Sequence, residues 1–156
     1  MPIKKIGKYY LMEFQNSNRP SRDQLYISIA RLIATRGTCM RAKVGCVICR
    51  DNRIISTGYN GPPKGTPHCS PKICNINVHC ERAIHAEANA ISFAAKEGIS
   101  TNGATLYCTH SPCSNCAKLI IQAGILRVVY ETLYDDKGLN LLNEAGIEIC
   151  KYEDNI

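Results

Sequence analysis

His85-Ala86-Glu87, followed by Pro112-Cys113-Ser114-Asn115-Cys116, decides how the rest of the chain is interpreted. One histidine and two cysteines provide three of the four ligands that a zinc ion takes in a tetrahedral site. Structural zinc sites are normally closed by four protein ligands, whereas three ligands leave one position for a water molecule. Glu87 is not needed as a ligand, so it is available to transfer protons. The pattern therefore predicts a hydrolytic zinc site.

Both motifs stand where helices are predicted to begin. Apolar residues at helical spacing occupy positions 85–96 and 113–124. Cys113 and Cys116 are one helical turn apart, which places their side chains on one face, about 5–6 Å apart at Cβ. Helix N-termini favour thiolates, and Glu87 in the first turn can reach the open position. A structural zinc site, or cysteines that only pack, is the alternative, but neither explains a free glutamate beside the histidine.

The chain divides into a short arm and one domain. Residues 1–20 have no clear periodicity, which predicts an N-terminal arm, and residues 21–156 are long enough to bury the core of one domain. Within this domain Ser21 is expected to cap the first helix. Two β-branched runs at 44–49 and 53–59 surround a short polar turn and predict a hairpin.

Helices and strands alternate after this hairpin. Strands are predicted at 104–109, 126–130 and 147–152, and a further helix at 140–145. Together with the helices at the two zinc motifs, this order predicts an α/β fold. We expect a sheet that helices cover on both faces and that is mostly parallel after the hairpin.

The composition limits the partners and the compartment. The formal net charge is +6, but no run of five or six like charges appears, so small anionic ligands are favoured over nucleic acid. No stretch approaches 18 apolar residues, so no membrane span is expected. Ten cysteines behind an N-terminus that lacks the features of a signal peptide indicate a reducing, cytoplasmic location.

The chain closely resembles the deoxycytidylate (dCMP) deaminases of the cytidine deaminase superfamily. His-x-Glu with Pro-Cys-x-x-Cys is a known signature of the zinc deaminases and specifies only the superfamily. The sequence Gly-Tyr-Asn-Gly-Pro-Pro-Lys-Gly at 58–65 and Asn89-Ala90 after the zinc histidine narrow the resemblance to the dCMP branch. With the stretches 44–48 and 112–118, it covers roughly residues 21–150.

This resemblance implies a fold and an activity. The expected architecture is a three-layer α/β/α sandwich around a five-stranded mixed sheet. The expected reaction is the zinc-dependent hydrolysis of dCMP to dUMP, with release of ammonia. Relatives are usually homo-hexamers that dCTP activates and dTTP inhibits, and the resemblance implies the same partners here.

The resemblance also implies substrate-binding positions. Asn60 matches an asparagine that holds the sugar hydroxyl, although a turn role before glycine is the alternative. The backbone N–H of Ala86 would meet the pyrimidine carbonyl, and the backbone carbonyl of Ser111 would meet the amine. Tyr134 matches an aromatic residue that lines the pocket in relatives. The positions implied near a regulatory nucleotide, for which a solvated surface is the alternative, are Arg41, Lys43, Tyr59 and Gly61.

A second group of potential metal ligands lies in or near the connection 60–84. This connection begins with a Pro/Gly-rich stretch, which forbids regular structure, and one so long is usually functional or held by something. Some relatives hold a second, structural zinc at this place, and four ligands would stabilise such a loop. The implied ligands are Cys39, Cys69, Cys74 and His79, with Cys80 as an alternative to Cys74. Otherwise these residues are reduced surface thiols and imidazoles.

Two other classes of function stay open. The first is deamination of another substrate: dCTP, methylated dCMP, free cytidine, guanine, or a base within RNA or single-stranded DNA. The insert at 62–84 and the lack of an aromatic-rich basic stripe argue against a polymer. The second is a zinc-stabilised nucleic-acid-binding module without turnover, against which the free Glu87 and the three-ligand count argue.

Overall fold

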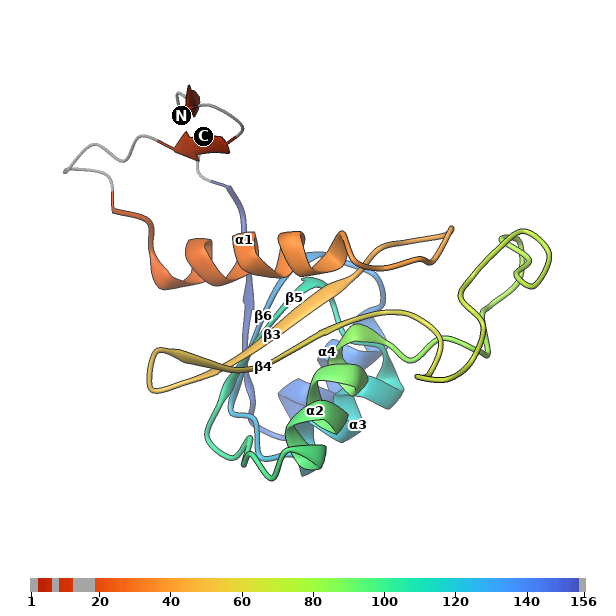
Figure 1. Cartoon of the computed structure of the whole chain (residues 1–156). Coiled ribbons are helices and arrows are strands. Elements are labelled where there is room, and N and C mark those ends of the chain that lie inside the picture. The colour runs from red at the N-terminus through yellow and green to blue at the C-terminus, as the bar shows by residue number, and fades with distance from the viewer. Residues whose placement is uncertain (1–2, 7–8, 13–18, 155–156) are drawn as a thin grey trace.

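Five strands, with helices on both sides, form the central sheet of the computed structural model, which describes residues 3–6, 9–12 and 19–154 (Figure 1). The strands are β3 (Gly45–Arg50), β4 (Arg53–Tyr59), β5 (Thr105–His110), β6 (Arg127–Thr132) and β7 (Glu148–Lys151). The helices are α1 (Arg22–Ala34), α2 (Ala86–Lys96), α3 (Ser114–Gln122) and α4 (Asp136–Glu144). Helix α1 covers one face, and α2, α3 and α4 cover the other (Figure 1). The predicted three-layer α/β/α sandwich around a five-stranded mixed sheet is confirmed.

The strand order is β4-β3-β5-β6-β7, so the predicted hairpin forms one edge of the sheet. Strand β3 is antiparallel to β4 and also to β5, whereas β5, β6 and β7 are parallel to one another. The expectation of a sheet that is mostly parallel after the hairpin is confirmed for β5, β6 and β7, while the β3–β5 pair that joins them to the hairpin is antiparallel. The second strand of the hairpin lies at the edge, so the first strand meets the rest of the sheet.

Side-chain caps explain where α1 and α4 begin. The predicted cap of α1 is confirmed, because Ser21 Oγ accepts a hydrogen bond from the backbone N–H of Gln24 at 3.1 Å. Helix α4 begins at Asp136 and not at the predicted position 140, because Asp135 Oδ1 accepts from the backbone N–H of Lys137 at 2.8 Å. An aspartate at this position satisfies one of the free N–H groups of the first helical turn.

Apolar side chains fill both spaces between the sheet and the helices. The cluster facing α2, α3 and α4 includes the fully buried Ile48, Leu106, Ile120, Val128 and Leu142. The cluster under α1 includes Tyr26, Ile27, Val47, Tyr107 and Val129. Glycine allows the closest approach on the first side: a Cβ on Gly58 of β4 would lie 2.3 Å from the carbonyl oxygen of Ala86 in α2. This contact sets the depth of the helix that carries the His-x-Glu motif.

Part of the predicted arm forms a small sheet of its own. Strands β1 (Ile3–Ile6) and β2 (Tyr9–Met12) pair antiparallel, apart from the five-stranded sheet (Figure 1). The rest of the arm up to residue 18 lies outside the described residues. Among the helices of the described part of the chain, none has both the length and the apolar character that crossing a bilayer requires.

Candidate metal centre and nucleotide pocket

The two predicted metal motifs meet at the N-termini of α2 and α3. His85 is the N-cap residue of α2, and Cys113 is the N-cap residue of α3. Neither side chain forms the hydrogen bond to a helix N–H that a capping side chain normally makes. Both are therefore available as ligands, while the positive ends of the two helices favour negative charge beside them.

Three side chains form a cluster with the dimensions of a zinc site. His85 Nδ1 lies 3.4 Å from Cys113 Sγ and 3.5 Å from Cys116 Sγ, and all ligand atoms lie within 4.8 Å of one another. In a tetrahedral site with ordinary Zn–N and Zn–S bonds, nitrogen and sulfur are about 3.6 Å apart. Among the described residues this is the one group of at least three potential ligands that meets the distance criterion. The donor set and its spacing fit a zinc ion.

Cys113 favours the thiolate form, whereas Cys116 favours the thiol form. Hydrogen bonds from Cys116 and His85 lower the pKa of Cys113 to about 3. The same contact with Cys113, together with burial, raises the pKa of Cys116, so the two sulfurs share one proton. A divalent cation at this point replaces that proton and favours both thiolates, because a metal is the largest local charge in its site.

Glu87 is a buried carboxyl group beside the cluster. It lies in the first turn of α2, and only 4% of its surface is exposed. Burial raises the pKa of Glu87 to about 7. A group with such a pKa can both accept and release a proton near neutral pH, as a general acid and base must.

A cavity of about 300 Å³ opens over this centre. His85, Glu87 and Cys113 line this cavity. The lining also contains every residue predicted to contact substrate: Asn60, Ala86, Ser111 and Tyr134. The volume lies at the lower end of the range for small-molecule sites. The structure thus brings Glu87, the predicted substrate residues and two of the predicted metal ligands to one cavity, and the third ligand, Cys116, adjoins them in the metal cluster.

The side chain of Asn60 forms hydrogen bonds with the backbone of a segment that lines this cavity. Its Oδ1 accepts a hydrogen bond from the backbone N–H of Val44 at 2.8 Å, and its Nδ2 donates to the carbonyl of Ala42 at 2.9 Å. These partners are distant in sequence and Asn60 is 8% exposed, so its side chain does more than complete a local turn. One N–H and one lone pair of the amide remain for a ligand.

The hydroxyl group of Ser111 forms hydrogen bonds with the backbone at Tyr134 and Asp135. Ser111 Oγ accepts from the backbone N–H of Tyr134 at 2.8 Å and from that of Asp135 at 3.2 Å. Tyr134 itself is 57% exposed at the cavity, and Ala86 is fully buried at the start of α2. Since the Ser111 hydroxyl is occupied, its backbone carbonyl is the group left for the predicted substrate contact.

The residues predicted near a regulatory nucleotide are spread over the structure. Arg41 lines the catalytic cavity, and its Nη1 donates to the carbonyl of Val78 at 2.9 Å. Lys43 is exposed, and Gly61 pairs with Ile84 in an isolated bridge. Tyr59 ends β4, where its carbonyl accepts from Asn89 Nδ2 at 2.9 Å. In the described part of the chain, Arg41 is the member of this set that reaches the cavity.

The second predicted metal group surrounds a neighbouring cavity of about 320 Å³. Its lining includes Cys39, Cys69, Cys74, His79 and Cys80. Burial and the adjacent Cys74 raise the pKa of Cys69. These residues surround one cavity. However, among the described residues, their sulfur and nitrogen atoms do not form a group within 4.8 Å of one another, as those of His85, Cys113 and Cys116 do.

His110 is a cavity residue that the sequence pattern did not single out. It ends β5, three residues before Cys113, and lines the catalytic cavity with Asn60 and Glu87. Burial lowers its pKa. The signal in the sequence is weak: a polar residue at the end of a predicted strand, just ahead of a metal motif.

Comparison with known proteins agrees with this geometry. A sequence profile described as the cytidine and deoxycytidylate deaminase zinc-binding region matches residues 20–132. ComE operon protein 2 of Bacillus subtilis is 44% identical over 138 residues, covering 86% of this chain and 73% of that protein. The deoxycytidylate deaminase of Schizosaccharomyces pombe is 41% identical over 149 residues, covering 88% of this chain and 46% of the relative. The chain thus spans about half the length of that relative.

A solved structure has the same fold. The dCMP deaminase from the cyanophage S-TIM5, crystallised in complex with dCMP and dUMP, superposes with a TM-score of 0.79 at 34% sequence identity. The match covers 86% of this chain and 98% of the phage protein.

Proposed function

The chain belongs to the cytidine and deoxycytidylate deaminase family, and we propose that it catalyses the zinc-dependent hydrolysis of dCMP to dUMP and ammonia. One observation carries this proposal: a cavity of suitable size is lined by the buried Glu87 and by two members of a three-residue metal cluster. The similarity to a phage enzyme that binds dCMP and dUMP supports the choice of nucleotide.

In the proposed reaction, three side chains would bind the metal and Glu87 would transfer protons. A zinc ion held by His85, Cys113 and Cys116 would supply a water molecule whose pKa is lowered from about 15.7 to about 7. Glu87 would take one proton from the water and deliver it to the ring nitrogen next to the carbon under attack, as the C–O bond forms at that carbon. Glu87 would then carry the proton of the newly added hydroxyl group to the amine, so that the C=O bond forms while the C–N bond breaks and ammonia leaves. A carboxyl group that both accepts and donates protons needs the raised pKa that burial gives it.

The other cavity residues orient the nucleotide in this proposal. The free N–H and lone pair of Asn60 would hold the sugar hydroxyl, and the backbone N–H of Ala86 would hold the pyrimidine carbonyl. The carbonyl of Ser111 would accept from the amine, and Tyr134 would close the exposed side of the pocket. Together they would place the reacting carbon over the open metal position.

The test is ammonia release from a panel of substrates. We expect turnover of dCMP, with lower kcat/KM for deoxycytidine, cytidine and dCTP, and none for single-stranded DNA. Methylated dCMP belongs in the panel because a methyl group adds little bulk. A wild-type protein that binds zinc but releases ammonia from none of these nucleotides would contradict the proposal and favour a binding module.

We propose a second, structural zinc ion bound by Cys39, Cys69, Cys74 and His79, with Cys80 as the alternative to Cys74. Support comes from their shared cavity in a Pro/Gly-rich segment that has little regular structure of its own. The measurement is the zinc content of the purified protein. Two ions per chain are expected, one in the C69S variant, and two in a C150S control, since Cys150 lies in β7.

We further propose the regulation and assembly that the family resemblance implies. dCTP would activate and dTTP inhibit through Arg41, Lys43, Tyr59 and Gly61, in a homo-hexamer. The unpaired state of all ten cysteines supports a reducing, cytoplasmic location, and no nucleic-acid partner is proposed. Residues 1–20 would form an arm and 21–156 the deaminase domain. Rates that dCTP leaves unchanged in magnitude and sigmoidicity would remove the regulatory part, and light scattering tests the hexamer.

A further inference from the structure

His110 is a polar side chain of the catalytic cavity for which the proposed reaction gives no role. It is half-buried at the end of β5 and lines the cavity together with Asn60, Glu87 and Cys113. A partly buried imidazole in a ligand cavity has one donor and one acceptor when neutral, and its tautomer decides which nitrogen offers which.

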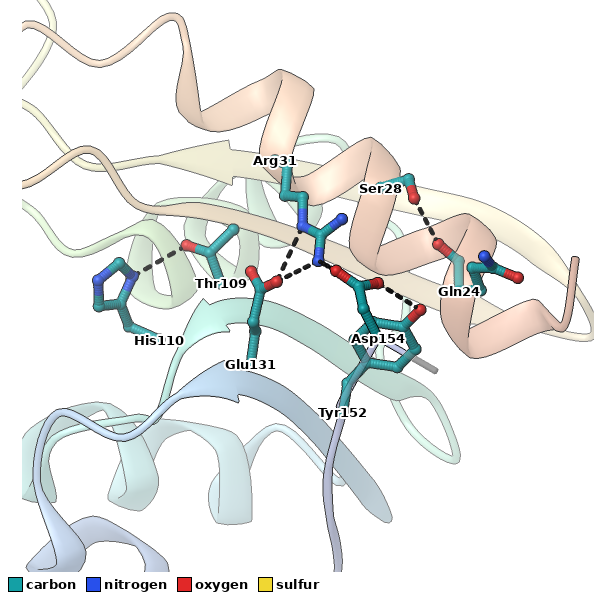
Figure 2. Close-up of polar contacts among 8 residues, drawn as sticks. All are labelled: Gln24, Ser28, Arg31, Thr109, His110, Glu131, Tyr152 and Asp154. Carbon is teal, nitrogen blue, oxygen red and sulfur yellow. Dashed lines mark hydrogen bonds and ion pairs between the residues drawn. The ribbon is translucent and has the colours of Figure 1, made fainter. Parts of the chain in front are cut away.

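A short chain of hydrogen bonds determines that tautomer. The backbone N–H of Gly45 donates to Thr109 Oγ1 at 3.2 Å, and Thr109 Oγ1 lies 3.0 Å from His110 Nδ1 (Figure 2). Thr109 is only 5% exposed, so its hydroxyl proton needs an acceptor inside the protein. Among the contacts of the described residues, His110 Nδ1 is that acceptor. Nδ1 therefore accepts, and the proton of the neutral ring resides on Nε2.

The surroundings keep the ring neutral. Burial lowers the pKa of His110, and the nearby Glu131 carboxylate opposes this effect to a smaller extent. Glu131 is engaged by the guanidinium of Arg31 on α1, with Nε 3.0 Å from Oε1 (Figure 2). This ion pair offsets the negative charge that would otherwise favour the imidazolium.

We propose that Thr109 fixes His110 as its Nε2–H tautomer, and that this N–H donates a hydrogen bond to an acceptor oxygen of the nucleotide in the cavity. The inference rests on the proposed function, since it names a specificity contact of the same site. His110 touches substrate in this proposal, and Thr109 is a positioning residue that acts through it. Figure 2 shows the second ring nitrogen on the side away from Thr109, where no other labelled side chain meets it.

Nitrogen-15 NMR of the histidine rings tests the tautomer directly. The chain has four histidines, so the H110Q variant assigns the signal of His110 by its loss. We expect the wild type to show the Nε2–H form near neutral pH, and saturating dCMP to shift the Nε2–H resonance. T109V should yield a mixture of tautomers, whereas T109S, which keeps the hydroxyl, should resemble the wild type. An Nδ1–H form in the wild type, or an Nε2–H signal that dCMP leaves unchanged, overturns the proposal.

Kinetics test the contact with the nucleotide. H110L should raise KM for dCMP by roughly fivefold with kcat nearly unchanged, because a hydrogen bond is worth about 1 kcal/mol, which corresponds to about that factor. H110Q keeps a donor and should recover part of this loss. If KM rises for dCMP but not for deoxycytidine, the acceptor is a phosphate oxygen; if it rises for both, the acceptor belongs to the nucleoside. Unchanged KM for both substrates in H110L contradicts the proposal.

These readouts separate the two proposals. A wild-type protein that deaminates none of the nucleotides refutes the proposed function, while the ring NMR still reports the tautomer of His110. Conversely, full dCMP deaminase activity with an unperturbed His110 refutes only the specificity contact.

Discussion

Glu87 is buried, which disfavours its charged form, yet it has neighbours that favour that form. A carboxyl group that is 4% exposed is costly to ionise, and burial accordingly raises its pKa to about 7. The neighbouring histidine and the helix N-terminus favour the charged form. The balance leaves a group whose two protonation states are close in free energy, as proton transfer in both directions requires.

The E87Q variant tests this role at the scale of one atom. Glutamine keeps the shape of the side chain but cannot take up a proton, so we expect zinc content to stay unchanged while kcat falls by about 10²–10⁴-fold. The measurements are metal analysis and ammonia release from dCMP. E144Q, an exposed residue in the last turn of α4, is the control. An E87Q protein that keeps a substantial share of wild-type kcat would exclude Glu87 as the proton carrier.

The sequence indicates each half of the metal cluster because the spacing within each motif is local, whereas the approach of His85 to the two cysteines depends on the fold. Cys113 and Cys116 are one turn apart, and a helix brings them together whatever the rest of the fold does. The role of Asn60 in bonding Ala42 and Val44 could not be predicted, since those bonds depend on how a loop folds back. His110 could not be predicted for a similar reason. It ends β5, and the alternation of residues along a strand does not show which cavity the last side chain will line.

At the scale of elements, α4 packs directly against the segment that carries the metal cysteines. Gly138 lies inside this helix, where alanine normally stabilises by about 1 kcal/mol. A Cβ at this position would lie 2.0 Å from the carbonyl oxygen of Pro112 and 2.9 Å from that of Cys113. The contact reverses the usual preference, because backbone atoms cannot move aside without displacing the α3 N-terminus.

We therefore expect G138A to lower the free energy of unfolding by about 1–3 kcal/mol, the range for overpacked sites. Urea-induced unfolding of both proteins measures this difference in free energy. N140A, in the same helix at an exposed position, should be neutral or stabilise by a few tenths of a kcal/mol, as helix propensity alone predicts. Equal stabilisation by both substitutions would show that α4 can shift freely over Pro112.

An ion pair joins α1 to the sheet. Arg127 of β6 donates from Nη1 and Nη2 to the two carboxylate oxygens of Asp23, both at 2.8 Å, and the Tyr107 hydroxyl donates to the same carboxylate at 3.0 Å. The bond with Arg127 is the main cause that lowers the pKa of Asp23 below its ordinary 3.8. With a lowered pKa, the stabilisation is fully present above pH 3.8 and is lost as pH falls through the still lower folded-state value.

The D23N variant should lose about 1–2 kcal/mol of unfolding free energy at neutral pH. The difference between wild type and variant should shrink once the pH is below the folded-state pKa of Asp23. Protonation of the metal ligands affects both proteins and cancels in this difference. Y107F is the matched variant, since it removes a neutral donor and keeps the ion pair. Because the Tyr107 hydroxyl also lowers the pKa of Asp23, the Y107F deficit should shrink in acid as well, but by less than that of D23N. A D23N deficit that persists unchanged in acid would contradict the ion-pair account.

The elements themselves were largely predictable, and their pairing was less so. The hairpin of β3 and β4 follows from two β-branched runs around Asp51-Asn52, which take the positive φ values a tight turn needs. The antiparallel contact of β3 with β5 joins strands that are far apart in sequence, and no local pattern reports it. The start of α4 was misplaced because Gly138 weakened the helical signal there, while the Asp135 cap overrides it.

At the scale of the whole molecule, the catalytic cavity and the cavity of the insert are neighbours that share lining residues. Both linings contain Cys39, Arg41, His79 and Cys80. The insert at 62–84 therefore contributes a wall to the nucleotide pocket. A metal bound among its cysteines would stabilise this wall as well as the loop, which links the second proposed zinc to the shape of the active site.

The buried core of residues 19–154 is assembled from the predicted domain itself. Both apolar clusters draw their members from Tyr26 to Tyr152, and α1 has its own cap at Ser21. A variant that begins at Arg19 should thus fold, with a melting temperature within a few degrees of the full chain and kcat for dCMP within about twofold. Thermal unfolding and ammonia release are the measurements. A loss of more than about 10 °C would mean that the β1–β2 sheet stabilises the domain, which would refute the proposed boundary at residue 20.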